Sequence, residues 1–295
     1  MNPREWALII FTTLAQLSVG TLIVLLIVRT YVTNKSGAEQ AGRMTDLPFY
    51  AVVGAMILAL IASLFHLGKV VHVIGAVPNL STSWMSREVV TSVTFMILTA
   101  VLAFLIWRKL GTEALRMVIG WVSAVVGLLL LFFMSMTYML PSQPAWNTWA
   151  TPVMFYTTSL LLGVLGAAAA LVFTHVDANA VEGQTMKGLA IASIVLMGLE
   201  LLVTPFYLAF LSTQGTAALH TLNLMVGTYG WALVIRLVLV FVGGGLLATY
   251  LFENASATGK EKVLATLAYS AFVLVLVSEF LGRFIFYATH YRIGI

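Results

Sequence analysis

The chain has 295 residues, of which 61% are hydrophobic and 9% are charged, and its formal net charge is +4. Soluble domains carry about 25% charged residues, so this composition indicates an integral membrane protein without a soluble catalytic domain. The positive residues are scattered singly and form no basic stripe, which argues against a nucleic-acid partner. The sequence contains no cysteine, so the chain can hold neither a disulfide nor a cysteine-ligated iron–sulfur cluster.

Eight apolar runs follow one another along the chain, each long enough for a membrane-spanning helix of about 20 residues. They predict spans at 6–32, 47–72, 88–108, 115–139, 151–175, 187–211, 228–251 and 264–288. Turn-forming residues separate the runs, for example Pro78-Asn79 and Pro141-Ser142-Gln143-Pro144. We therefore expect a single transmembrane domain over 1–295, an all-α bundle of eight helices whose first run is retained as a helix.

The lysine and arginine residues predict the orientation of the bundle. The connections after the first, third, fifth and seventh spans hold about nine of them, including Arg29, Lys35 and Arg43, against about five on the other side. The positive-inside rule assigns the richer side to the cytoplasm. Both termini are therefore expected outside the cytoplasm.

The few ionisable residues within the predicted spans concentrate in the outer half of the membrane. His66 lies near the outer end of the second span, and Glu88 opens the third. Glu279 and Arg283 stand on one face of the eighth span, and Arg236 lies in the seventh. Because an ionisable group costs about 2.5–3.5 kcal/mol in a membrane helix on insertion scales, their shared placement indicates a functional site.

Quinol oxidation fits the pair formed by His66 and Glu88. A neutral histidine can accept a proton from one ring hydroxyl, and a carboxylate can accept or relay the other. A structural interpretation stays open for both, with His66 as a core histidine and Glu88 as a first-turn acid after an N-cap at Ser86. Haem would need two histidines at matched depth, and only His66 with His72 or His290 is conceivable, so we expect no haem and no metal site.

The other charged residues also have alternatives. Glu279 and Arg283 can neutralise each other so that their span inserts, and Glu200 can pair with Arg236 for the same reason. A proton- or ion-coupled transporter would use such groups too, near the midplane and on discontinuous helices. The chain shows no clear internal repeat, and the outer-half placement of the ionisable groups favours quinol chemistry.

Short motifs along nearly the whole chain resemble the DMSO reductase membrane anchor subunit family of bacteria. They are, in order, Ile10-Phe11-Thr12, Ser63-Leu64-Phe65-His66-Leu67-Gly68, Ser86-Arg87-Glu88, Trp149-Ala150-Thr151-Pro152, Glu279-Phe280-Leu281-Gly282-Arg283 and Phe286-Tyr287. Each motif is short, but their order and the eight-span layout agree with that family.

The resemblance implies a haem-free anchor in the bacterial cytoplasmic (inner) membrane that binds and oxidises menaquinol near the periplasmic face. Its partners would be a four-cluster iron–sulfur subunit and a molybdopterin catalytic subunit on that face, with the terminal-acceptor site on another chain. The histidine and glutamate tied to quinol binding in the family map onto His66 and Glu88. We expect Arg236, Glu279 or Arg283 to complete the pocket, and the identity of the acceptor does not follow from this sequence.

Overall fold

The computed structural model describes residues 3–65, 78–174, 180–257 and 259–294, and every regular element in these ranges is a helix. The all-α class predicted from the sequence is therefore confirmed. The elements are α1 (Pro3–Ser36), α2 (Ala38–Leu64), α3 (Trp84–Trp107), α4 (Glu113–Tyr138), α5 (Ala150–Phe173), α6 (Ala180–Leu211), α7 (Thr216–Asn223), η2 (Leu224–Thr228), α8 (Gly230–Val240), η3 (Phe241–Leu247), α9 (Ala248–Asn254) and α10 (Glu261–Ala288).

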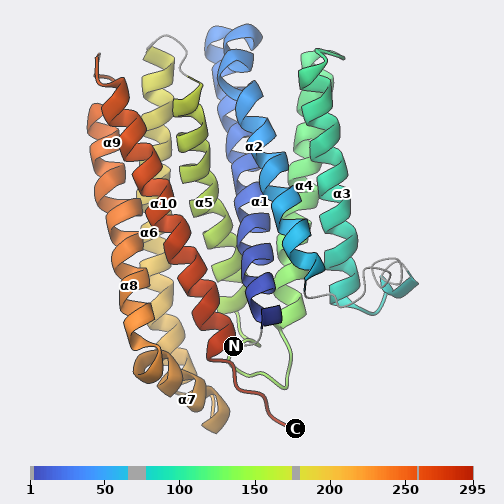
Figure 1. Ribbon diagram of the computed structural model, residues 1–295, viewed down its shortest axis with the longest axis vertical. Coiled ribbons are helices and arrows are strands. Elements are labelled where there is room, and N and C mark those ends of the chain that lie inside the picture. Colours follow the sequence, from blue (N-terminus) through green and yellow to red (C-terminus); the bar gives the residue numbers. More distant parts are fainter. Residues whose placement is uncertain (1–2, 66–77, 175–179, 258, 295) are drawn as a thin grey trace.

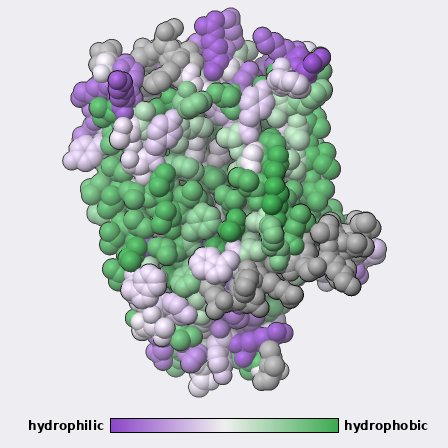
Figure 2. Space-filling view, viewed as in Figure 1, coloured by the Kyte–Doolittle hydropathy of each residue, from purple (hydrophilic) through white to green (hydrophobic). Residues whose placement is uncertain are grey.

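Eight helical segments in the described residues are long and apolar enough to cross a membrane, which confirms the predicted number of spans. Seven are single helices, and the remaining one, Gly230–Asn254, runs through α8, the π-helix η3 and α9. A hydrophobic belt surrounds the middle of the visible face, and hydrophilic residues gather at both ends (Figure 2). The two termini lie at one end of the bundle, which we call the terminal end (Figure 1).

The second span begins earlier than predicted. It starts at Ala38 rather than 47, because the charged segment is stabilised by Arg29 of α1. The Arg29 side chain is buried and reaches Asp46 of α2 at 2.5 Å and Glu113 of α4 at 2.6 Å. Arg29 therefore links three helices as well as contributing to the positive charge that predicts topology. The described helix ends at Leu64, and the predicted end at 72 lies outside the described residues.

Helix α1 lies at the centre of the bundle and packs against α2, α4, α5 and α10. Its closest approach is to α5, where Gly20 faces Gly163: a Cβ atom added to either glycine would overlap the backbone of the opposite helix. Small residues permit this kind of backbone contact between membrane helices. Near the same point the Ser159 hydroxyl donates to the Gln16 carbonyl at 2.8 Å. The backbones of α1 and α5 are therefore in direct contact at this point.

The π-helix η3 packs closely on two neighbours through its glycines. A Cβ on Gly243 would come within 2.9 Å of Val275 Cγ2 in α10, and one on Gly244 within 3.0 Å of Met197 Cβ in α6. Glycine thus allows the seventh span to lie directly against α6 and α10. The same approach brings Arg236 of α8, just before η3, to carboxylates on both of those helices.

Candidate functional site

A cluster of four charged side chains lies inside the bundle between α6, α8 and α10. It consists of Glu200 of α6, Arg236 of α8, and Glu279 and Arg283 of α10. The side chains of Glu279, Glu200 and Arg236 are 2%, 7% and 12% exposed. Arg236 donates from Nη2 to Oε1 of Glu200, and the same Nη2 atom lies 3.9 Å from Oε2 of Glu279. The expected pairing of Glu200 with Arg236 is confirmed.

The nearest ion-pair partner of Glu279 is Arg236 rather than Arg283, although Glu279 and Arg283 still interact electrostatically. Glu279 also accepts a 2.6 Å hydrogen bond from the Thr158 hydroxyl of α5 and faces Arg236. The Arg283 guanidinium carbon lies 3.6 Å from the ring centre of Phe155, a cation–π arrangement. Residues four apart on a helix can meet, but here aromatic packing against α5 turns Arg283 away from the carboxylate.

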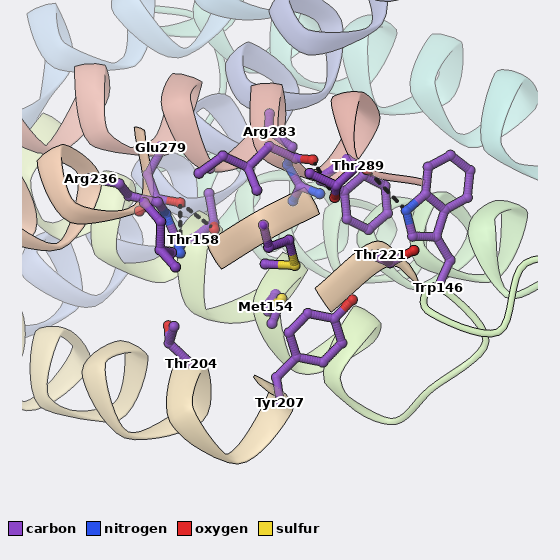
Figure 3. A pocket seen from close by; sticks show the side chains of 15 residues that line it. Trp146, Met154, Thr158, Thr204, Tyr207, Thr221, Arg236, Glu279, Arg283 and Thr289 are labelled. Carbon is purple, nitrogen blue, oxygen red and sulfur yellow. Dashed lines mark hydrogen bonds and ion pairs between the residues drawn. The ribbon is translucent and has the colours of Figure 1, made fainter. Parts of the chain in front are cut away.

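One polar atom on each charged residue of the cluster is buried and has no hydrogen-bond partner among the described residues. These atoms are Glu200 Oε2, Arg236 Nε, Glu279 Oε1 and Arg283 Nη2. A cavity of about 50 Å³ adjoins the cluster, and three of its charged residues, Arg236, Glu279 and Arg283, line it (Figure 3). A buried polar group left unsatisfied costs about 1–3 kcal/mol, so these atoms indicate a place where a polar ligand or water binds.

The connection between α4 and α5 contributes Trp146 to the lining of this cavity. The Trp146 ring stacks on Phe286 at 4.7 Å and on His290 at 4.8 Å, and its Nε1 donates to the Phe286 carbonyl. The Tyr207 hydroxyl of α6 donates to the Ala145 carbonyl at 2.9 Å. The place of Trp146 beside the cavity was not predicted from the sequence, because aromatic residues near span ends are typical of a membrane interface.

Glu88 is buried in α3, with 7% of its surface exposed. The N-cap of α3 is Ser83, whose hydroxyl accepts the backbone N–H of Ser86 at 3.2 Å, so the expected N-cap at Ser86 is wrong. The first turn of α3 contains no acidic residue, and Glu88 lies beyond it. Because the helix dipole acts within the first turn, it does not account for this carboxylate.

A pair of buried tyrosines lies between Glu88 and Arg283. The hydroxyl groups of Tyr138 and Tyr287 are 2.5 Å apart. Glu88 interacts with the Thr137 side chain and lies close enough to both tyrosines to interact with them electrostatically. Arg283 interacts electrostatically with the same two tyrosines. Sequence reasoning missed this pair, because tyrosines near span ends are typical of a membrane interface.

The structure brings together three of the five residues predicted for the site: Arg236, Glu279 and Arg283 line one cavity. Glu88 belongs to the same polar region through the tyrosine pair but does not line that cavity. His66 lies outside the described residues. The roles of all five stay predictions. Within the described ranges, no group of three or more histidine, aspartate or glutamate side chains is arranged to hold a metal ion.

Gly282 leaves room for the Arg236 side chain. A Cβ atom at Gly282 would come 2.5 Å from Arg236 Nε and 3.0 Å from its Cζ. We expect Gly282→Ala to displace Arg236 and to destabilise the protein by about 1–3 kcal/mol, as overpacking usually does. Unfolding measured in detergent checks this, with Gly198→Ala as the control, because a Cβ there meets nothing within 4 Å. Equal stability of the two variants would contradict the prediction.

Comparison with known proteins identifies the family. The model of the DMSO reductase anchor subunit (DmsC) family matches residues 1–289. This chain belongs to that family. The predicted family is therefore confirmed, and the chain is a multi-span membrane protein of the anchor-subunit type.

Three relatives of this anchor cover nearly its whole length. It is 26% identical over 294 residues to the C subunit of anaerobic dimethyl sulfoxide reductase from Escherichia coli (strain K12), and the alignment covers 99% of this protein and 96% of the relative. It is 28% identical over 303 residues to the YnfH subunit of an anaerobic dimethyl sulfoxide reductase from the same organism, with the same coverage. It is 26% identical over 293 residues to the C subunit from Haemophilus influenzae, covering 98% of this protein and 96% of the relative.

Proposed function

We propose that this anchor binds and oxidises menaquinol at the terminal end of the bundle and passes the electrons to an iron–sulfur subunit. A molybdopterin catalytic subunit would then reduce the terminal acceptor. Membership of the anchor-subunit family supports assembly into such a complex. The observation that carries the quinol assignment is the buried Glu88 carboxylate, which lies within electrostatic range of the buried pair Tyr138 and Tyr287.

Oxidation of one quinol yields one quinone, two electrons and two protons. In our proposal His66 and Glu88 hydrogen-bond to the quinol hydroxyls and accept the protons. Arg236, Glu279 and Arg283 line a cavity of about 50 Å³, which is too small for a quinone ring. In our proposal they complete the site beyond the ring, where they take part in proton release and do not contact the quinol. The electrons pass to the partner, because a chain without cysteine holds no cysteine-ligated cluster of its own.

The terminal end would face the periplasm of a bacterial cytoplasmic membrane, with the partner subunits docked there. The distribution of positive residues supports this orientation, since Lys35, Arg43, Arg108 and Lys109 all lie near the opposite end, in the end turns of α1 and α2 or in the connection after α3. Protons released from the quinol would then leave on the same side as the reductase. Under this proposal the reaction moves no net charge across the membrane.

The alternative function is a proton- or ion-coupled transporter, for which the buried pair of Glu200 and Arg236 is the relevant feature. Such a protein would act without partner subunits. Transporters of this kind typically bind at unwound breaks in their helices, whereas the described spans here are continuous helices. Co-purification discriminates between the two: an anchor brings down iron–sulfur and molybdenum subunits, and a transporter does not.

Binding of a fluorescent quinol analogue tests the proposal. We expect the purified complex to quench the fluorescence of the analogue, and His66→Ala to abolish the quench, because a hydrogen-bond partner of the quinol is removed. His220→Ala, which changes an exposed histidine of α7, is the control and should quench normally. Undiminished binding and turnover in both His66→Ala and Glu88→Gln would rule the site out.

A further inference from the structure

We propose that the cavity beside Glu279 is a water-filled path through which protons move between the charged cluster and the terminal end of the bundle. The source of the protons rests on the proposed quinol oxidation. The evidence for the path itself is the volume and lining of the cavity and the buried polar atoms of the charged cluster, which lies at the end of the cavity farthest from the chain termini. We call this the deep end of the cavity.

The volume of the cavity is large enough for water molecules and too small for an organic ligand. Its volume is about 50 Å³. A water molecule needs about 10–15 Å³ of such volume, so several fit. Pockets that bind organic ligands usually measure about 300–1,000 Å³, so a quinone ring does not fit here.

The cavity is lined by apolar and polar side chains together. Its threonines are Thr158 of α5, Thr204 of α6, Thr221 of α7 and Thr289, which follows α10. Three of these hydroxyls already donate within the protein, whereas the Thr221 hydroxyl is buried and has no partner among the residues that the structure describes. Waters in a cavity usually make about three hydrogen bonds each, and the Thr221 hydroxyl and the unpartnered atoms of the charged residues supply such bonds.

The cavity leads from the interior of the bundle toward its end. Glu279 and Arg236 line one side, and Thr221, Trp146 and Thr289 line the other (Figure 3). Along α10, Glu279 and Thr289 are about 15 Å apart at 1.5 Å per residue. The waters that fit in the cavity extend from the buried carboxylate toward the terminal end.

The deep end of the path is suited to hold and release a proton. Glu279 Oε1, Arg236 Nε and Arg283 Nη2 are buried there without a partner among the described residues. Two carboxylates and two guanidinium groups balance the charge of the cluster, so neither an anion nor a cation is favoured as its ligand. A carboxylate with one free oxygen facing water is a group that can take up a proton and pass it on.

Tyr138 and Tyr287 lie within electrostatic range of both Glu88 and Arg283. A guanidinium group cannot accept a proton, so Arg283 does not carry one from the tyrosines to the cavity. In our proposal the exchange runs through water between Glu279 and the terminal end, with one proton leaving for each one that enters.

Accessibility of introduced cysteines to silver ions tests the path directly. The chain has no cysteine, so Thr204→Cys places the sole thiol of the anchor in the cavity wall. Leu202→Cys is the matched control on the same helix, because Leu202 is 56% exposed on the apolar surface. The complex is treated with Ag⁺, and the thiols still free are labelled with a maleimide after unfolding.

We expect Ag⁺ to block Thr204→Cys at least about ten-fold faster than Leu202→Cys, because a thiol ionises and reacts only where water reaches it. Equal or slower blocking of Thr204→Cys would overturn the path. This readout requires no quinol and no turnover.

The proton-carrying role is tested by Glu279→Gln, which can still accept the hydrogen bond from Thr158. We expect kcat for quinol oxidation to fall about ten-fold while binding of the quinol analogue is retained. Full turnover in this variant would overturn the proton role and leave the proposed function standing. Absence of quinol oxidation by the unsubstituted complex would contradict the proposed function, and the silver experiment would still decide whether the path exists.

Discussion

The Glu88→Gln complex is expected to oxidise quinol at least about 100-fold more slowly than the unsubstituted complex, the usual lower effect of removing a general base. Glutamine has nearly the same shape as glutamate and can still hydrogen-bond to Thr137, so the packing around the buried position is retained. It cannot accept a proton, however. A quinol hydroxyl next to it would keep its proton, and electron transfer would stall.

Quinol-dependent reduction of the terminal acceptor by purified complex measures this effect. Glu253→Gln, which changes an exposed residue of α9, is the control and should keep normal turnover. The amount of co-purified partner subunits shows whether assembly is unchanged. Turnover of Glu88→Gln within two-fold of the control would remove Glu88 from the mechanism.

The second large effect concerns stability. We expect Arg236→Met to destabilise the protein by about 3–5 kcal/mol, because breaking a buried ion pair leaves an uncompensated charge. The loss of Arg236 leaves Glu200 without its hydrogen-bonded partner and Glu279 without its nearest cation. Both carboxylates are buried in the bundle, so bulk solvent compensates their charge poorly.

Arg43→Met is the matched control for this prediction. Arg43 also pairs with a glutamate, Glu39, at 2.6 Å, but the two side chains are 60% and 82% exposed. Such a surface pair contributes about 0–1 kcal/mol. Unfolding by SDS titration in mixed micelles compares the variants. A loss in Arg236→Met no larger than that in Arg43→Met would contradict the prediction.

Adding Glu200→Gln to Arg236→Met separates the charge effect from the loss of packing. Glutamine carries no charge, so the double variant should recover a large part of the lost stability if the unpaired carboxylate is the cause. Additive losses in the double variant would show instead that the contribution of Arg236 comes from packing. The same SDS titration supplies both numbers.

The number and order of the spans could be predicted because hydropathy is a local property of about 20 residues. The start of α2 could not, since the helix continues through Asp46 only because Arg29 from α1 meets it. The same long-range contact gives Arg29 a structural role that counting positive charges did not reveal. The position of a helix boundary can thus depend on a contact with a residue that is distant in the sequence.

The residues of the candidate site were visible in the sequence because charge is costly inside a membrane and therefore stands out. The interaction partners of these residues could not be predicted from the sequence. Spacing suggested that Glu279 pairs with Arg283, whereas the fold pairs it with Arg236 and Thr158 and turns Arg283 onto Phe155. Helical spacing shows which residues can meet, and packing between helices decides which of them do.

The sequence by itself determined that this protein crosses the membrane eight times and which acids and bases it places within the membrane, because composition and hydropathy act residue by residue. Only the tertiary structure decided that Tyr138 and Tyr287 pair near Glu88, and that Trp146 and Tyr207 line the cavity beside the charged cluster. Those contacts involve helices far apart in the chain. They arise from the way α4, α6 and α10 pack at one end of the bundle, which no local pattern encodes.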